Sequence, residues 1–230
     1  MRDKATEHAG LTLRLRGAPI KAILMVLLVT AHLCQAAGSD FVVVFGDSIT
    51  QGGALPAADR PRLWVNLVEK DSAGRLKLIN EGKGGRPTAS VKEFEAMLAR
   101  QPRADLLVIA LGTNDSRDIT KDCVPKAVAN LRWMIGRARK TYGPNVPVLL
   151  VGPPNINKSA LVATKPIANE REAKLRDIGD GFARLAKELG CEFVSLFGTV
   201  PEASMTKDGV HPDADGNAAI ARAMLPGLKR

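Results

Sequence analysis

Short apolar runs alternate with longer segments of helical periodicity, and this alternation restricts the fold more than any other feature of the chain. The apolar runs predict five buried strands, at 41–45, 76–79, 106–111, 146–151 and 192–196. Apolar residues recur at helical spacing in 61–72, 88–100, 124–141, 167–189 and 215–228. Strands that alternate strictly with helices predict an α/β fold, with a five-stranded parallel sheet covered by helices on both faces.

The N-terminal segment has the layout of a secretory signal. Basic residues at 14, 16 and 21 precede an apolar stretch at 22–33, and small residues follow at 36–38. The apolar stretch is shorter than the roughly 20 residues that a membrane-spanning helix needs. We therefore predict a cleaved signal peptide at 1–37 and one compact domain at 38–230, which is periplasmic or secreted and has no stable membrane insertion after cleavage.

The cysteines permit two modifications. Lipid attachment at Cys34 is an alternative to a soluble exported product, but Leu33 and Ala31 before it fit a lipidation signal poorly. Export to an oxidising compartment allows a disulfide between Cys123 and Cys191, and two separate buried thiols are an equal alternative. The spacing of these cysteines does not resemble that of a zinc site.

The net charge argues for a solvated surface rather than for a nucleic-acid partner. The chain has a formal charge of +9, and the predicted signal contains five of its basic residues and two of its acidic ones. A basic exported protein can attract acidic polymers or membrane surfaces, but its charge more commonly serves solubility. No basic run is interleaved with aromatic residues, so we expect no nucleic acid to bind.

Polar and glycine-rich segments follow the predicted strands. They are Gly46-Asp47-Ser48 after the first strand, Asn80 to Gly85 after the second, Gly112 to Asp115 after the third, and Asp208 to His211 after the fifth. Ligands bind at the carboxyl ends of the strands in open parallel sheets. We therefore expect these four segments to meet at one edge of the sheet.

The four segments contain the groups that acyl transfer needs. A serine hydroxyl becomes a good nucleophile when a histidine takes its proton and a carboxylate orients that histidine. Ser48 and Asp208 fit two of these roles, and His211 is the only histidine beyond the predicted signal. The backbone amides of Ser48 and Gly85 and the side chain of Asn114 are candidate donors to an oxyanion. Taken singly, Ser48 fits a helix N-cap and His211 a turn equally well.

The four segments together resemble the blocks of the GDSL, or SGNH, hydrolases. GDSIT matches the serine block, N-x-G-x-x-G at 80–85 the glycine block, G-T-N-D at 112–115 the asparagine block and D-G-V-H at 208–211 the last one. The resemblance implies a flavodoxin-like three-layer α/β/α fold with strand order 2-1-3-4-5 and no metal or cofactor. It also implies a catalytic triad formed by Ser48, Asp208 and His211. It implies an oxyanion hole formed by Ser48, Gly85 and Asn114.

The substrate predicted from the sequence is a small-molecule or carbohydrate ester with a short acyl group. Aromatic residues are few and no long apolar lid segment is visible, so an O-acetyl group on an extracellular carbohydrate is the first choice. A lysophospholipase or thioesterase is the alternative within the same chemistry. A magnesium-dependent phosphoryl-transfer enzyme using Asp47, Asp115 and Asp208, and a non-catalytic glycan-binding module, are alternatives of other classes.

Several further residues have expected structural roles. We expect Asp47 and Asp115 to hold their loops by accepting hydrogen bonds from backbone amides, and the loops at 116–125 and 152–166 to select the substrate. We expect two tryptophans in the core and four basic residues as solvated charge near the rim, with substrate contact as the alternative for the latter. These residues are Trp64 and Trp133, and Arg60, Arg62, Arg86 and Lys165.

Overall fold

The computed structural model describes residues 39–162 and 167–228. The predicted signal peptide, Cys34 and Lys165 lie outside these residues, as does part of the expected selectivity loop at 152–166. Within the described ranges, none of the helices combines the length and the apolar composition needed to cross a bilayer.

Five parallel strands form one sheet in the order β2-β1-β3-β4-β5. They are β1 (Asp40–Gly46), β2 (Leu76–Gly82), β3 (Leu106–Ala110), β4 (Val148–Gly152) and β5 (Glu192–Ser195). The predicted fold class and strand order are therefore confirmed. The second strand is longer than expected: Asn80, Glu81 and Gly82 continue it, because their backbones pair with Val44, Phe45 and Gly46 of β1 although their side chains are not apolar.

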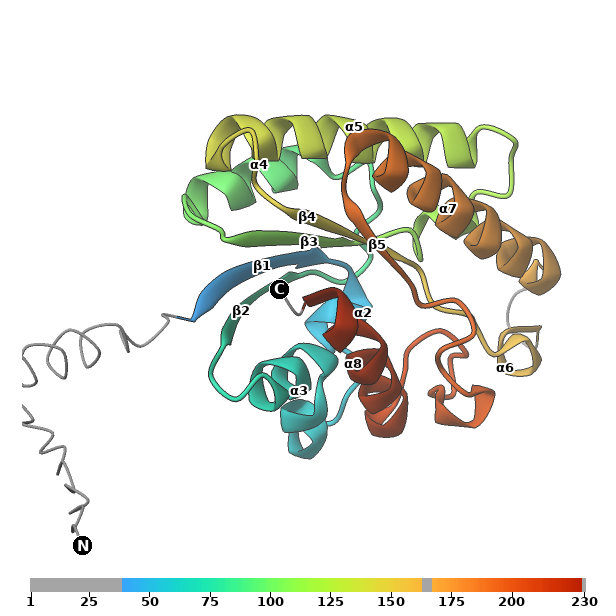
Figure 1. Cartoon of the computed structure of the whole chain (residues 1–230). Helices are drawn as coiled ribbons and strands as arrows, with labels where there is room; N and C mark the ends of the chain where they lie inside the picture. The colour runs from blue at the N-terminus through green and yellow to red at the C-terminus, as the bar shows by residue number, and fades with distance from the viewer. Residues whose placement is uncertain (1–38, 163–166, 229–230) are drawn as a thin grey trace, which may run out of the picture. The chain divides into compact units, whose positions relative to one another are not determined.

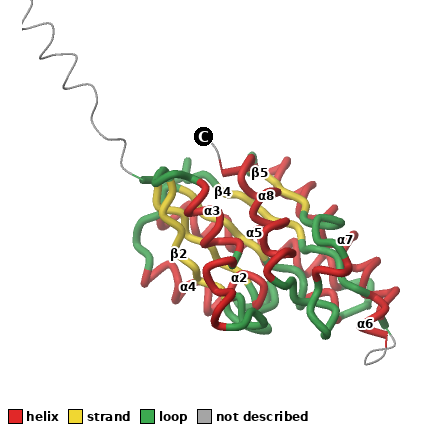
Figure 2. Tube along the Cα trace, turned by 90° about the horizontal axis from the view of Figure 1, so that it is seen from below, coloured by secondary structure: helices red, strands yellow, loops and turns green. Residues whose placement is uncertain are grey.

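Helices cover both faces of the sheet (Figure 1). One face packs against α3 (Trp64–Asp71) and α8 (Ala214–Leu228), and the other against α4 (Val91–Arg100), α5 (Cys123–Tyr142) and α7 (Ala168–Leu189). Successive residues of a strand point to opposite faces. Accordingly, Val42 and Val44 pack in the core on the side of α3 and α8. Val43 and Phe45 pack in the core on the side of α4, α5 and α7. Figure 2 views the molecule from the side of α3 and α8, which lie across the strands.

Short elements occur in the connections, most of them near the carboxyl ends of the strands. Helix α2 (Ser48–Gln51) follows β1 directly, and α6 (Lys158–Val162) lies in the long connection after β4. Three 3₁₀ turns complete the described structure: η1 (Ala57–Arg62), η2 (Asp115–Arg117) and η3 (Glu202–Ser204). The sequence did not predict these elements, because a single helical turn is too short to show a periodicity.

The two tryptophans differ in their surroundings. Trp64 is 2% exposed and lies in the core, as expected. Trp133 is 38% exposed, and its ring is 5.8 Å from the guanidinium carbon of Arg137, so the expectation of core packing was wrong. The buried side of α5 includes Ala127, Leu131 and Met134. Two residues beyond Leu131, a helix has turned by about 200°, which carries Trp133 to the outer side.

The cysteines of the described chain are free thiols. Cys123 is buried and Cys191 is half-buried, and no disulfide joins them. Burial raises the pKa of the Cys123 thiol to about 11. Of the two alternatives that the sequence left for this pair, the structure has separate thiols.

Candidate active site

Ser48 is the first residue of α2, at the point where β1 ends. The preceding residue, Asp47, is the N-cap of this helix and its side chain accepts a 3.0 Å hydrogen bond from the amide of Ile49. Ser48 is thus not the cap, and its Oγ is free to lie 2.8 Å from His211 Nε2. The turn is tight, since a Cβ atom on Gly46 would lie 2.1 Å from Thr50 Oγ1.

His211 and Asp208 belong to one compact turn. Asp208 Oδ2 lies 2.5 Å from His211 Nδ1. The other carboxylate oxygen accepts hydrogen bonds from Thr206 Oγ1 at 3.0 Å, from Val210 N at 2.8 Å and from His211 N at 2.9 Å. Partial burial disfavours the charged carboxylate, but the hydrogen bonds from His211 and Val210 outweigh it and lower the pKa of Asp208 to about 2. A carboxylate therefore orients the imidazole and stays charged across the neutral range.

Gly209 fits this turn against the start of α6. Its φ is +71°, a value that glycine adopts without strain. The carbonyl of Gly209 accepts a 2.8 Å hydrogen bond from Asn157 N, and a Cβ atom at Gly209 would lie 2.6 Å from Asn157 O. The turn that carries His211 thus needs glycine at this position both for its backbone angles and for its contact with the neighbouring segment.

The glycine block lies against the segment that carries Ser48. The Asn80 side chain donates a 2.8 Å hydrogen bond to Thr50 O, and Lys83 N donates to Gly46 O at 3.1 Å. A Cβ atom on Gly82 would lie 2.3 Å from Gln51 N, so only glycine lets the end of β2 meet the backbone of α2. Gly85 has a φ of +72°, and within the described chain its amide makes no hydrogen bond.

Asn114 connects the third segment to the glycine block. Its side-chain Nδ2 donates a 3.1 Å hydrogen bond to the carbonyl of Arg86, the residue after Gly85. The neighbouring Asp115 accepts from Thr88 N, at 3.1 and 3.0 Å, and from Thr88 Oγ1. Hydrogen bonds thus join the four predicted segments: the serine segment to the histidine turn and to the glycine block, and the residue after the glycine block, Arg86, to the asparagine segment.

Asp47 and Asp115 hold their loops by accepting hydrogen bonds from backbone amides, as predicted. Asp47 caps α2 and Asp115 binds Thr88. Burial raises the pKa of Asp47 to about 6 and raises that of Asp115. Among the described residues, no three His, Cys, Asp or Glu side chains gather as metal ligands would. Asp47, Asp115 and Asp208 therefore do not form the carboxylate cluster that the phosphoryl-transfer alternative requires.

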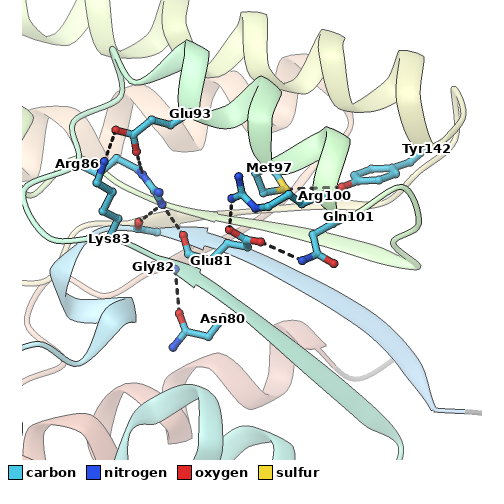
Figure 3. Close-up of polar contacts among 11 residues, drawn as sticks. Asn80, Glu81, Gly82, Lys83, Arg86, Glu93, Met97, Arg100, Gln101 and Tyr142 are labelled. Carbon is cyan, nitrogen blue, oxygen red and sulfur yellow. Dashed lines mark hydrogen bonds and ion pairs between the residues drawn. The ribbon is translucent and has the colours of Figure 1, made fainter.

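Arg86 overturns one expectation. The sequence favours solvated charge at this position, but Arg86 is only 6% exposed, and its guanidinium carbon lies 4.1 Å from the centre of the Phe45 ring. Its Nε donates to Glu93 at 2.9 Å, within the group of polar contacts shown in Figure 3. A signal was present in the sequence, because this arginine stands directly after the last residue of the glycine block, Gly85.

The other described basic residues near the rim are exposed, as expected. Arg62 pairs with Asp215 at 2.6 Å, and Arg60 donates to the Gln51 carbonyl at 3.2 Å. Lys165 lies outside the described residues.

A small cavity of about 10 Å³ adjoins Ser48 and His211. Its other lining residues are small or apolar, apart from one amide: Ile49, Gly52, Ala54, Leu55, Pro212 and Asn217. This volume is about that needed to hold one water molecule, so the cavity receives only a small part of an acyl group beside the serine hydroxyl.

Comparisons with known proteins agree with this arrangement. A sequence model of the GDSL-like lipase/acylhydrolase family matches residues 44–219. An uncharacterized lipoprotein of Bacillus subtilis (strain 168), YqeF, is 35% identical over 103 residues, which are 43% of this chain and 42% of the relative. The chain therefore matches less than half the length of this relative.

Solved structures share the fold over most of the chain. A carbohydrate acetylesterase family member from Sinorhizobium meliloti has a TM-score of 0.65 and 24% identity, with 81% of this chain and 96% of the other covered. A proposed arylesterase from Agrobacterium tumefaciens has a TM-score of 0.67 and 28% identity, with 82% of this chain and 98% of the other covered. A catalytic mutant of Axe2, an acetylxylan esterase from Geobacillus stearothermophilus, has a TM-score of 0.64 and 19% identity, with 84% of this chain and 96% of the other covered.

The family match spans most of the chain and includes all four blocks that were identified in the sequence. The chain therefore belongs to the GDSL-like lipase/acylhydrolase family and is a carboxylic ester hydrolase.

Proposed function

We propose that the protein is an exported serine esterase that removes short acyl groups, O-acetyl groups foremost, from carbohydrate or other small alcohols. The observation that carries the proposal is the continuous line of contacts from Ser48 Oγ through the His211 ring to Asp208, at 2.8 and 2.5 Å. Nucleophile, base and orienting carboxylate need this sequence of hydrogen bonds.

The proposed reaction has two acyl-transfer steps. His211 Nε2 takes the hydroxyl proton of Ser48 while Oγ bonds to the acyl carbon, and the carbonyl oxygen becomes an oxyanion. The ester C–O bond then breaks, the leaving alcohol takes the proton from His211, and an acyl group remains on Ser48. Water repeats the sequence and releases the acid. Asp208 stabilises the imidazolium that forms in each step.

Three donors are proposed to hold the oxyanion: the amides of Ser48 and Gly85 and the side chain of Asn114. Two features support this assignment. The amides of Ser48 and Gly85 make no hydrogen bond within the described chain, and the Asn114 side chain lies beside the Gly85 segment through its contact with Arg86. Donors that are fixed before the reaction stabilise the transition state without having to reorganise.

The small cavity beside Ser48 supports the choice of a short acyl group. Its volume of about 10 Å³ leaves no room for a long chain, and the residues around it are mostly compact. The names of two solved structures of the same fold, a carbohydrate acetylesterase family member and an acetylxylan esterase, agree with an acetylated carbohydrate as the first substrate to test.

Export is part of the proposal. The predicted signal at 1–37 supports it, and so does the name of the Bacillus relative, which is a lipoprotein. The mature N-terminus of protein recovered from an exporting host distinguishes the two forms. Cleavage near residue 37 gives the soluble protein, and a lipidated N-terminus at Cys34, abolished by Cys34→Ser, gives the anchored one.

The central experiment combines active-site labelling with a substrate series. A fluorophosphonate probe should label the wild-type protein on Ser48, as located by peptide mass spectrometry, and should not label Ser48→Ala. The ratio kcat/KM should be highest for acetyl or butyryl p-nitrophenyl esters. The enzyme should also release acetate from acetylated xylan. An unlabelled Ser48 in an active enzyme would refute the mechanism. A steady rise in activity up to decanoyl esters would refute the short-acyl assignment and favour a lysophospholipase or thioesterase.

A further inference from the structure

The Arg86 side chain connects the ends of β1 and of the edge strand β2. Its Nη1 donates to the carbonyl of Gly46 at 2.7 Å and also to the carbonyl of Glu81. Both residues lie in the last residue pairs between β1 and β2. Gly46 stands two residues before Ser48. Figure 3 shows Arg86 reaching from the glycine block back to the β2 residue Glu81.

The surroundings of this guanidinium fix it in one position. The side chain is 5% exposed, and burial of a charge is costly unless the charge is paired and hydrogen-bonded. Here Glu93 supplies the opposite charge, two carbonyls accept from Nη1, and the face of Phe45 lies 4.1 Å away. A planar guanidinium can satisfy all of these partners at once, and the single ammonium group of lysine cannot.

The backbone of Arg86 belongs to the loop that carries one of the proposed oxyanion donors, the amide of Gly85. Its carbonyl accepts the hydrogen bond from Asn114 Nδ2, and its amide follows Gly85. Two residues later, Thr88 is held by Asp115. One residue therefore contacts the strand before Ser48 with its side chain and the asparagine segment with its backbone.

We propose that Arg86 is a positioning residue that holds the Gly85 amide and the Asn114 side chain in register with Ser48. This inference rests on the proposed serine mechanism. Because oxyanion donors act mainly in the transition state, loss of their alignment lowers kcat and leaves KM nearly unchanged. A purely structural role for Arg86 would lower the melting temperature and leave kcat of the folded enzyme intact.

The test compares Arg86→Met and Arg86→Lys with Arg100→Met. Arg100 is the matched control, because it pairs with the Glu81 carboxylate at 2.6 Å beside the same strand and is 55% exposed. Kinetics with p-nitrophenyl acetate are measured well below the lowest melting temperature. We expect Arg86→Met to lower kcat by about ten-fold to a hundred-fold with KM within about two-fold, because small misplacements of reacting groups have effects of this size. Arg86→Lys should fall between it and wild type, and Arg100→Met should keep the wild-type kcat.

Two further measurements separate positioning from stability. Low concentrations of guanidinium chloride should partly restore kcat of Arg86→Ala and should not restore that of Asn114→Ala. Arg86→Met should also cost less in an Asn114→Ala background than in wild type, because residues that act as one unit are non-additive. A wild-type kcat in folded Arg86→Met or Arg86→Lys overturns the inference, as does full additivity. Retained activity in Ser48→Ala would instead refute the proposed function.

Discussion

The segment that carries Ser48 and the turn that carries His211 are held in place by different means. Ser48 follows a strand whose residues 42–45 are fully buried, and Gly82 and Arg86 contact the backbone on either side of it. Asp208 has a side chain that is 49% exposed, and its contacts lie within the turn at 206–211. The position of the nucleophile therefore depends on the sheet, and the position of the base depends mainly on hydrogen bonds within its own turn and on the contact of Gly209 with Asn157.

The largest expected effect treats both regions as one unit. Ser48→Ala and His211→Ala should each lower kcat by about a million-fold, and the double variant should lose little more, since both residues act in the same step. Neither change should alter the free energy of unfolding by more than about 0.5 kcal/mol, because both side chains lie at the rim. Stopped-flow and steady-state kinetics with denaturant titrations measure both. A tenth of wild-type activity in folded Ser48→Ala would break the comparison.

The next effect isolates the local turn. Asp208→Asn keeps an oxygen for the backbone amides but holds the imidazole in the wrong tautomer, so we expect kcat to fall by about ten thousand-fold. Thr206→Val is the matched control, because it removes only the 3.0 Å hydrogen bond to the same carboxylate. It should change kcat by less than about ten-fold. An equal loss of kcat in the two variants would mean that catalysis depends on the conformation of the turn and not on the charge of Asp208.

A smaller effect is expected on the sheet side. Asn114→Ala removes one proposed oxyanion donor and should lower kcat by about a hundred-fold to a thousand-fold, with KM almost unchanged. Asn130→Ala is a suitable control, since Asn130, on α5, donates to Thr88 Oγ1 at 3.1 Å without being a proposed oxyanion donor. Steady-state kinetics with p-nitrophenyl acetate distinguish them. An unchanged kcat in Asn114→Ala would remove this residue from the site.

The smallest expected effect concerns stability and contrasts Asp47 with Asp208. Burial raises the folded-state pKa of Asp47 from its usual value of 3.8 to about 6, so folding takes up a proton at pH values between these two. The free energy of unfolding should therefore fall by on the order of 3 kcal/mol in total as the pH rises from about 3 to about 7. Asp47→Asn should flatten this slope in urea titrations at several pH values. Asp208→Asn should not, because the lowered pKa of Asp208 affects stability only at more acidic pH.

The periodicity of the sequence was sufficient to predict the strands, the five long helices and the edge where the four blocks meet. It failed where the determining partner is a backbone group. The continuation of β2 through Asn80 and Glu81 is set by pairing with β1, and the burial of Arg86 is set by the carbonyls of Gly46 and Glu81. Side-chain hydrophobicity reports none of these partners, and a charged residue in a loop is usually solvated.

The candidate site could be predicted from residue types, because acyl transfer requires few kinds of group and four blocks contained all of them. The contacts that hold these groups in place could not. Asp208 satisfies three donors of its own turn in addition to the imidazole, and the spacing D-x-x-H alone does not specify them. Trp133 was misplaced for a simpler reason, since an offset of two residues from Leu131 points away from the buried side of α5.

The close approach of Gly82 to Gln51 limits how the enzyme can be redesigned. Helix α2 supplies both Ser48 and the Ile49 wall of the small cavity, and the end of β2 presses directly on its backbone. A substitution that shifts this helix to enlarge the cavity would also displace the nucleophile. The wall formed by Leu55 lies beyond the end of the helix. Engineering toward bulkier acyl groups should therefore start at Leu55 and leave α2 unchanged.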